Sequence, residues 1–319
     1  IIQEWGKEKF SVFRETIWSS SLQQLDLPRV RNFLIKNNID NVDVSLVIPQ
    51  KGHNTHRMRW MKYYEKSGQC ISSLKEEFIP DSSNNLKLTF CYSSEEDEQN
   101  NKTQTIHTVN TLRLIFGVPI ARELLILRHF YNDDNAPTRS SDEDFASMFD
   151  TQSLNMFDNP AIEDSEVMKI PDEATILLDK AFSQTYPIER FILMWLAFET
   201  IINSFPGEGN NGTKRQNFFK NDLKSDVIND EVFRLFRVRC DMFKEGKIFK
   251  LNVEKECWSL YSVIQLTIMK NCPQRQAFLS GYEKILLQNK GMTLVTTYPS
   301  NIARVTGIIN EANSLNKKI

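Results

Sequence analysis

Apolar and polar positions follow different periods in the two halves of the chain. In the first half, residues 42–48 alternate and are closed by Pro49, which predicts a strand, and residues 86–92 predict a second strand. Residues 60–64 are a candidate third strand. A short helix is expected to begin near Pro28, because proline suits the first turn of a helix. Together these elements predict a small domain of mixed helices and strands.

The stretch between Thr105 and Phe130 carries a longer apolar pattern. Its first part, TIHTVNTLRLIFG, fits a strand followed by a helix, and its second part, VPIARELLILRHFY, predicts a helix that begins near Pro119. In that helix Arg122 and His129 would lie about 20° apart around the axis. No glycine follows this R-x6-H spacing, so we interpret it as coincidence.

Acidic residues dominate the segment between Asp133 and Glu173, which contains DD, DED and ED clusters and several prolines. This composition is typical of a solvated spacer, so we expect residues 133–169 to form a linker. In the alternative hypothesis, its carboxylates occupy a basic phosphate-binding site of the helical half and imitate a nucleic acid.

After Pro171 the apolar spacing is helical throughout. Residues 187–205 are apolar on nearly every side, as expected for a helix at the centre of a bundle. Shorter helical patterns cover residues 174–182, 215–220, 257–268, 278–286 and a stretch that follows Ser300. The loop PGEGNNG lacks the GK[ST] ending of a phosphate-binding loop, so we interpret it as a connection.

One helix in this half carries the candidate chemistry. Asn229 or Asp230 would cap it, and its apolar spacing ends at Gly246. Its apolar face is expected to comprise Val232, Phe236, Cys240 and Phe243. The arginines that must project from the flanks of that face are Arg234, Arg237 and Arg239.

These three arginines have two interpretations. A guanidinium group forks onto phosphate or carboxylate, which makes them candidate phosphate ligands. Alternatively, the flank is solvated and its arginines pair with neighbouring acids. The acids within reach are Asp230, Glu231 and Asp241, the last of which lies four residues after Arg237.

Two segments of this half resemble the HEPN superfamily of helical ribonucleases, and most closely its ApeA-like branch. Family members carry an L-W-x-A-x-E pattern on an upstream helix, which is matched here by Leu193, Trp195, Ala197 and Glu199, with one extra residue between the leucine and the tryptophan. They later carry R-x(4–6)-H followed by glycine. The segment from Arg239 to Gly246 matches this motif, with Lys244 at the position of the histidine.

The resemblance implies a metal-independent endoribonuclease that works as a homodimer. In the family, the motifs of two protomers meet, and the 2′-hydroxyl beside the cleaved bond attacks the phosphate. The histidine moves protons and the arginine balances the growing charge, which are roles suited to their pKa values. RNA, and tRNA in particular, is the implied partner, and no cofactor is implied.

Carried onto this chain, the motif names specific residues. Arg239 matches the family arginine, with Arg237 as a competitor; Asp241 matches a polar position inside the motif. Glu199 matches the upstream glutamate, which we expect to orient an arginine. The implied catalytic set is Arg239, Lys244, Glu199 and Asp241, and the implied RNA-binding set is Arg237, Arg234 and Lys247.

Lys244 departs from the family pattern. A lysine, with an ordinary pKa of about 10.4, is a poor proton shuttle at neutral pH, although its ammonium group still binds phosphate. Three interpretations remain open for this position. They are natural loss of catalysis with retained RNA binding, catalysis by a different arrangement, and a deliberate inactivating substitution.

Composition narrows the choice of function further. The formal net charge of −2 gives no global attraction for nucleic acid, so RNA binding needs a local basic patch.

The five cysteines lack CxxC spacing, and His53 and His56 lie in an expected loop, so we expect neither a disulfide framework nor a metal site. We expect no histidine in the helical half. No apolar run is long enough to span a bilayer, which predicts a soluble cytoplasmic protein without membrane partners.

These patterns together predict an α+β protein. We expect a mixed recognition or sensor domain at residues 1–132, the acidic linker at 133–169 and an all-α, HEPN-like bundle at 170–319. The leading functional hypothesis is RNA binding or cleavage in bacterial anti-phage defence by abortive infection. The alternative is a non-enzymatic interaction module within a larger nucleic-acid-associated assembly.

Overall fold

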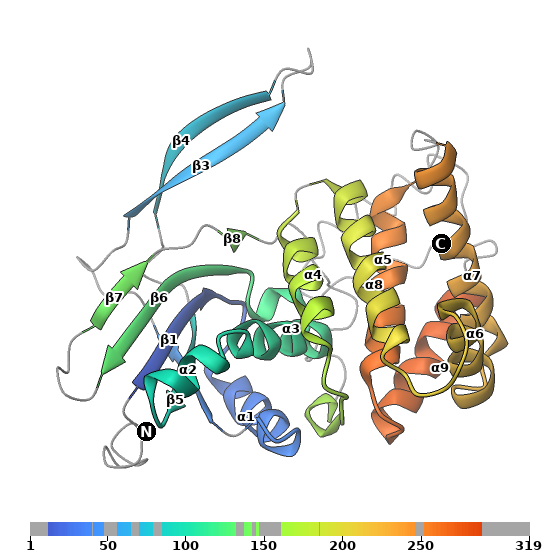
Figure 1. Ribbon diagram of the computed structural model, residues 1–319, viewed down its shortest axis with the longest axis horizontal. Helices are drawn as coiled ribbons and strands as arrows, with labels where there is room; N and C mark the ends of the chain where they lie inside the picture. The colour runs from blue at the N-terminus through green and yellow to red at the C-terminus, as the bar shows by residue number, and fades with distance from the viewer. Residues whose placement is uncertain are drawn as a thin grey trace. The chain divides into compact units, whose positions relative to one another are not determined.

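The computed structural model describes residues 12–39, 41–47, 56–64, 70–78, 85–131, 137–141, 145–146, 161–184, 186–245 and 252–288. Over these residues the chain is α+β and divides into two compact units (Figure 1). The first unit comprises residues 1–105 and 119–147, and the second comprises residues 106–118 and 148–319. The helical unit therefore includes residues 106–118, which the sequence pattern had assigned to the N-terminal domain.

An antiparallel sheet forms the centre of the first unit. Its described strands lie in the order β2 (Val42–Val47), β5 (Asn85–Tyr92), β1 (Val12–Ser19), β6 (Glu123–Tyr131) and β7 (Pro137–Ser141), and β8 (Phe145–Ala146) also pairs with β6. β1 lies between β5 and β6 and is buried along nearly its whole length. Its sequence, VFRETIWS, therefore lacks the alternation that marks a strand with one exposed face.

A separate hairpin joins β3 (His56–Tyr64) to β4 (Cys70–Phe78). Three strands predicted from the sequence are thus confirmed, as β2, β5 and part of β3. The helix predicted near Pro28 is confirmed as α1 (Leu27–Lys36). The sequence pattern did not predict β1, β4, β7 or β8.

The helix predicted to begin near Pro119 is wrong, because its central part is strand β6. This segment pairs with β1 from Glu123 opposite Ser19 to Tyr131 opposite Val12. A continuous apolar run carries no periodicity that separates a strand from a buried helix, which explains the error. The preceding segment is also corrected, since α3 (Gln104–Phe116) is helical where a strand was expected to begin.

Part of the predicted acidic linker belongs to the fold. β7 and β8 lie within it and pair with β6. Further along, the Met168 N–H donates to the Ile268 carbonyl, and the Lys270 N–H donates to the Glu166 carbonyl, both at 2.8 Å. The prediction of a spacer is therefore wrong for these parts, while residues 147–160 lie outside the described residues.

The polar run that follows β5 also forms a helix, α2 (Glu95–Asn100). The Asp97 N–H donates to the hydroxyl of Ser94 at 3.1 Å, so Ser94 caps the helix. Acidic side chains fill the first turn, where the helix dipole favours negative charge. A segment that looks like a solvated run is thus a helix fixed by its cap.

The second unit is helical. Besides α3, its described helices are α4 (Asp172–Ser183), α5 (Pro187–Asn203), α6 (Asn211–Gln216), α7 (Asp226–Glu245), α8 (Val253–Ile268) and α9 (Pro273–Gln288), with a π-helical turn, η4 (Asn217–Asp222), after α6. α5 packs against both α4 and α8 (Figure 1). Its aromatic side chains, Phe191, Trp195 and Phe198, are all buried. This arrangement confirms the predicted central helix. The helix expected after Ser300 lies outside the described residues.

Candidate functional site

α7, which carries the three arginines, begins earlier than predicted. The Ile228 N–H donates to the Ser225 hydroxyl at 3.1 Å, and the helix starts at Asp226. Ser225 therefore occupies the capping position that the sequence pattern gave to Asn229 or Asp230.

α7 also buries a different face from the predicted one. Its buried apolar residues are Ile228, Val232, Leu235, Val238 and Met242. Phe243, which was expected in the core, is 52% exposed, and Phe233 is 53% exposed. Phe236 and Cys240 are half-buried. The helix thus keeps a second apolar stripe at the surface.

Arg234 fits the interpretation of a salt-bridged structural residue. Its guanidinium group pairs with Glu231 at 2.7 Å and with Glu256 of α8 at 2.5 Å. The hydrogen bonds that Arg234 donates to Glu231, helped by the one it donates to Glu256, raise the pKa of Arg234 above its ordinary value. The positive charge of Arg234 is therefore balanced within the fold, which disfavours its predicted role in RNA binding.

Arg237 and Arg239 lie over aromatic rings of their own helix. The Cζ atom of Arg237 is 4.5 Å from the centre of the Phe233 ring, and the Cζ atom of Arg239 is 5.0 Å from the centre of the Phe243 ring. Arg237 adopts this contact in place of the pair with Asp241 that the spacing suggested. Among the described residues, the buried Nε atom of Arg239 has no hydrogen-bond partner. Each arginine and its ring thus form a cationic and aromatic surface.

Glu199 of α5 binds an arginine, but this arginine comes from α6. The carboxylate pairs with Arg215 and accepts a hydrogen bond from the Asn211 amide at 2.5 Å. The Arg215 guanidinium also lies over the rings of Trp195, at 5.7 Å, and Phe236, at 5.0 Å. The expectation that Glu199 orients an arginine stands, with Arg215 as the partner. The sequence pattern had assigned Arg215 to a short helix and had given it no role in the candidate site.

Arg215 and Arg239 are close enough to repel each other. Burial lowers the pKa of Arg215, Glu199 raises it, and the charge of Arg239 lowers it again. Two positive groups and one negative group therefore meet where α5, α6 and α7 come together. This cluster carries a surplus positive charge beside the Arg239–Phe243 surface.

The structure describes the remaining candidate residues of the motif only in part. Lys244 lies in the last turn of α7, about 20° around the helix axis from Arg237. Its side chain, Gly246 and Lys247 lie outside the described residues. Asp241 is about 160° around the axis from Arg239, so it faces away from the cluster with Arg215.

A threonine, histidine and aspartate in the helical unit have the geometry of a nucleophilic triad. The Thr175 hydroxyl oxygen is 3.0 Å from His107 Nδ1, and His107 Nε2 is 2.7 Å from an Asp172 carboxylate oxygen. However, Thr175 is fully buried, whereas the Asp172 side chain is 59% exposed, the reverse of what a nucleophile and its orienting acid need. We interpret the group as the contact that fixes α3 to the first turn of α4. His107 lies outside residues 170–319, where no histidine occurs, and belongs to the helical unit because that unit also includes residues 106–118.

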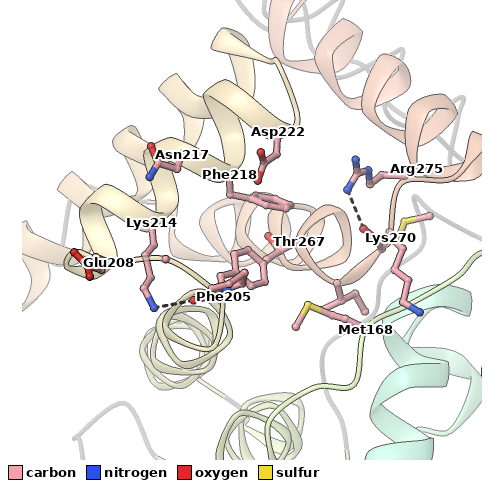
Figure 2. A pocket seen from close by; sticks show the side chains of 14 residues that line it. Met168, Phe205, Glu208, Lys214, Asn217, Phe218, Asp222, Thr267, Lys270 and Arg275 are labelled. Carbon is pink, nitrogen blue, oxygen red and sulfur yellow. Dashed lines mark hydrogen bonds between the residues drawn. The ribbon is translucent and has the colours of Figure 1, made fainter.

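A pocket of about 260 Å³ lies elsewhere in the helical unit, with the side chains of Phe218, Thr267 and Arg275 among those around it (Figure 2). Its lining residues are distinct from the cluster of Glu199, Arg215 and Arg239. It is therefore a second feature of this unit with room for a ligand.

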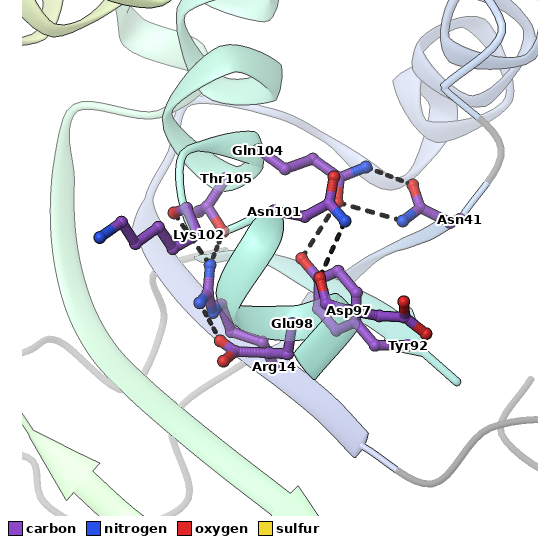
Figure 3. Close-up of polar contacts among 9 residues, drawn as sticks. All are labelled: Arg14, Asn41, Tyr92, Asp97, Glu98, Asn101, Lys102, Gln104 and Thr105. Atoms are coloured by element: carbon purple, nitrogen blue, oxygen red, sulfur yellow. Dashed lines mark hydrogen bonds and ion pairs between the residues drawn. The ribbon is translucent and has the colours of Figure 1, made fainter. Parts of the chain in front are cut away.

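A polar cluster in the first unit is structural in character (Figure 3). Arg14 of β1 pairs with Glu98 of α2 and donates to the Lys102 carbonyl at 3.1 Å. The Tyr92 hydroxyl donates to the side chain of Gln104 at 3.0 Å. Because both partners of the ion pair are buried, we interpret the cluster as the joint between the sheet and the segment that follows β5.

These features define an α+β protein whose helical unit carries an arginine and aromatic surface. In the described part of the chain, no cluster of histidine, cysteine, aspartate or glutamate side chains could hold a metal ion, and Cys91, Cys240, Cys257 and Cys272 are free thiols. Nor does any described helix have the length and apolar character needed to cross a membrane. Comparison of the chain with protein-family models, with curated proteins and with solved structures found no match.

Proposed function

We propose that the helical unit is a HEPN-like RNA-binding module and that RNA contacts the exposed face of α7. One observation carries this proposal, the stacking of Arg237 on Phe233 and of Arg239 on Phe243. Unpaired bases stack on aromatic rings and on guanidinium planes, while guanidinium N–H groups bind phosphate. The two pairs offer both kinds of contact on one helix.

The exposure of the rings supports a binding role. Phe233 and Phe243 are each more than half exposed, whereas other apolar residues of the same helix are buried. Exposed apolar groups that gather on one face mark interaction sites more often than chance. The distribution of charge agrees, because Arg234 is neutralised by its glutamates while Arg239 has an unused N–H. The surplus positive charge of Arg215 and Arg239 beside this face would attract RNA phosphate.

The second part of the proposal is metal-independent cleavage by the arrangement that the HEPN resemblance implies. Arg239 would balance the charge that grows on the attacked phosphate, with Glu199 holding Arg215 beside it. Lys244 occupies the position from which the family histidine moves protons. Two copies of α7 would face each other in a homodimer. In bacterial anti-phage defence, such a nuclease would stop growth by cutting tRNA or other RNA.

A non-enzymatic interaction module is the second candidate function. It is favoured by Lys244, which is a poor proton shuttle, and by Glu199, whose carboxylate is engaged with both Arg215 and Asn211. In this case the α7 face would bind RNA or a partner without cutting.

The deciding experiment measures binding and cleavage of labelled tRNA and mRNA in the presence of EDTA. The unchanged chain, Lys244→His, and Lys244→His combined with Arg239→Ala are compared. We expect the unchanged chain to bind RNA with little cleavage, Lys244→His to cut and leave cyclic phosphate ends, and the double variant not to cut. Arg234→Gln is the matched control and should bind RNA like the unchanged chain.

Two outcomes would contradict the proposal. If none of the proteins binds RNA, the RNA-binding function fails, and the interaction module with another partner remains. If RNA is bound but Lys244→His does not cut, the nuclease part fails alone. Sedimentation analysis adds an independent check, because a strict monomer cannot form a site that needs two copies of α7.

A further inference from the structure

The pocket of about 260 Å³ in the helical unit has an apolar wall and a cationic end (Figure 2). The segment after α5, the π-helical turn η4, the end of α8 and the start of α9 enclose it. Phe205 and Phe218 pack against each other on one side, with ring centres 4.9 Å apart, and Met168 lies on another side. This wall suits an apolar body more than a highly charged one.

Arg275 extends from α9 toward this pocket (Figure 2). The residue is only 6% exposed, and its Nη1 atom donates to the Met269 carbonyl at 3.2 Å. Its Nε atom is buried and has no hydrogen-bond partner among the described residues. A buried donor without a partner is costly, so an acceptor from outside the chain is expected here. The Nε and Nη2 edge of a guanidinium is shaped to receive the two oxygens of a carboxylate.

The charges around the pocket favour a ligand with a single negative charge. The lining cations are Lys214, Lys270 and Arg275, and the lining anions are Glu208 and Asp222. Lys214 is already used, because its ammonium group donates to the carbonyls of Asn203 and Phe205 at 2.8 Å each. Lys270 is exposed and also lines the pocket, and its charge is not screened by a partner among the described residues. Counted together with Lys214, whose charge the neutral carbonyls do not cancel, the lining cations exceed the lining anions by one.

We propose that this pocket binds a small organic monocarboxylate, with its carboxylate on Arg275, attracted also by the charge of Lys270, and its apolar body against Phe218 and Met168. The volume lies just below the range of about 300–1,000 Å³ that holds drug-sized ligands, which points to a small molecule. The proposal does not depend on RNA binding, since the residues of the α7 face do not line the pocket.

The test is a titration of the full chain with benzoate and with benzamide, its neutral counterpart of the same shape, followed by ligand-observed NMR. We expect benzoate to bind at least about tenfold more tightly than benzamide, because a hydrogen bond to a charged group accounts for about one order of magnitude in affinity. Arg275→Met should weaken benzoate binding by about tenfold or more. Lys270→Gln should weaken it by about threefold, since the lysine is exposed. Lys220→Gln, an exposed lysine of η4 that does not line the pocket, should have no effect.

Arg275→Met also removes the donor to the Met269 carbonyl, so its thermal unfolding is measured alongside. Lys270→Gln changes an exposed side chain and keeps the test valid if Arg275→Met does not fold. The proposal is overturned if benzoate does not bind to the unchanged chain, or if benzamide binds equally well. It is also overturned if Lys270→Gln binds benzoate as tightly as Lys220→Gln does.

Discussion

Two arginine–carboxylate pairs in the helical unit are built in opposite ways. The pair of Arg113 and Asp179 is enclosed, because the Arg113 side chain has no exposed surface and also donates to Asn110 at 3.2 Å. The pair of Arg215 and Glu199 lies at an edge, with side chains 13% and 21% exposed, and has Arg239 as a charged neighbour. The first pair is surrounded by groups that satisfy it, whereas the second has a positive charge to spare.

Burial lowers the pKa of both arginines, but the neighbouring charges differ. For Arg113 the pKa falls to about 10, and the carboxylate of Asp179 opposes the fall. For Arg215 the carboxylate of Glu199 opposes the fall, while a second arginine adds to it. An enclosed pair of this kind fixes helices in place, and an edge pair beside a surplus cation presents charge to a ligand. This difference guides the following predictions.

Breaking the enclosed pair should have the largest effect. Arg113→Met removes the cation that pairs with the largely buried Asp179 carboxylate, so we expect a loss of about 3–5 kcal/mol in the free energy of unfolding. Urea denaturation of the helical unit measures this loss. The matched change at the edge, Arg215→Met, should cost clearly less. Equal losses would remove the distinction between the two pairs.

Removing the exposed rings should weaken RNA binding without unfolding the chain. Phe233→Ala and Phe243→Ala are each expected to cost about 1–3 kcal/mol of binding free energy to single-stranded RNA, the usual contribution of a base stacked on a ring. Fluorescence anisotropy with a labelled oligonucleotide measures this cost. Leu287→Ala, a comparably exposed residue on α9, is the control. If all three variants bind alike, bases do not stack on this face.

The arginines of α7 should differ in the salt dependence of RNA binding. A phosphate contact contributes about 0.7 to the slope of log affinity against log salt for a single strand. We therefore expect Arg237→Gln and Arg239→Gln each to reduce the slope by about that amount. Arg234→Gln should leave the slope unchanged, because Glu231 and Glu256 already balance its charge. A reduced slope for Arg234→Gln would place RNA on the other flank of the helix.

Neutralising the edge carboxylate should have a smaller effect of opposite sign. Glu199→Gln keeps the shape of the side chain but leaves Arg215 and Arg239 without a counter-charge, so RNA affinity should rise by about two- to fivefold. Glu254→Gln, which alters the pair with Arg190 at the start of the same helix, is the control. A fall in affinity for Glu199→Gln would mean that RNA needs Arg215 held in its present position.

Local sequence signals predicted the helices better than the sheet, of which only β2 and β5 were expected. α1, α4, α5, α8 and α9 follow from spacing within each segment, because a helix makes its hydrogen bonds locally. β6 did not follow, since its apolar run becomes a strand only by pairing with β1, more than a hundred residues earlier. Central strands depend on partners that a local pattern does not contain.

The candidate site was predicted in part for a similar reason. Glu199 and Arg239 were both candidate residues, and the structure places them around Arg215, which the sequence pattern did not single out because a loop and a short helix bring it there. The mistaken core position of Phe243 has another cause. α7 carries apolar residues on two sides, and only the packing of neighbouring helices decides which side is buried.

The smallest expected effect concerns Cys240, which lies half-buried on α7 between the rings and the last turn. Burial raises the pKa of the Cys257 thiol to about 12 and that of the Cys91 thiol to about 12, so both should react slowly with iodoacetamide at neutral pH. Cys240 is more accessible and should be modified first. Bound RNA should slow this modification by a few-fold while leaving Cys91 and Cys257 unchanged, as read by peptide mass spectrometry. If RNA binds but Cys240 reacts at the same rate, RNA lies on another surface. The surplus positive charge beside the pair of Arg215 and Glu199 would then have no role in binding it.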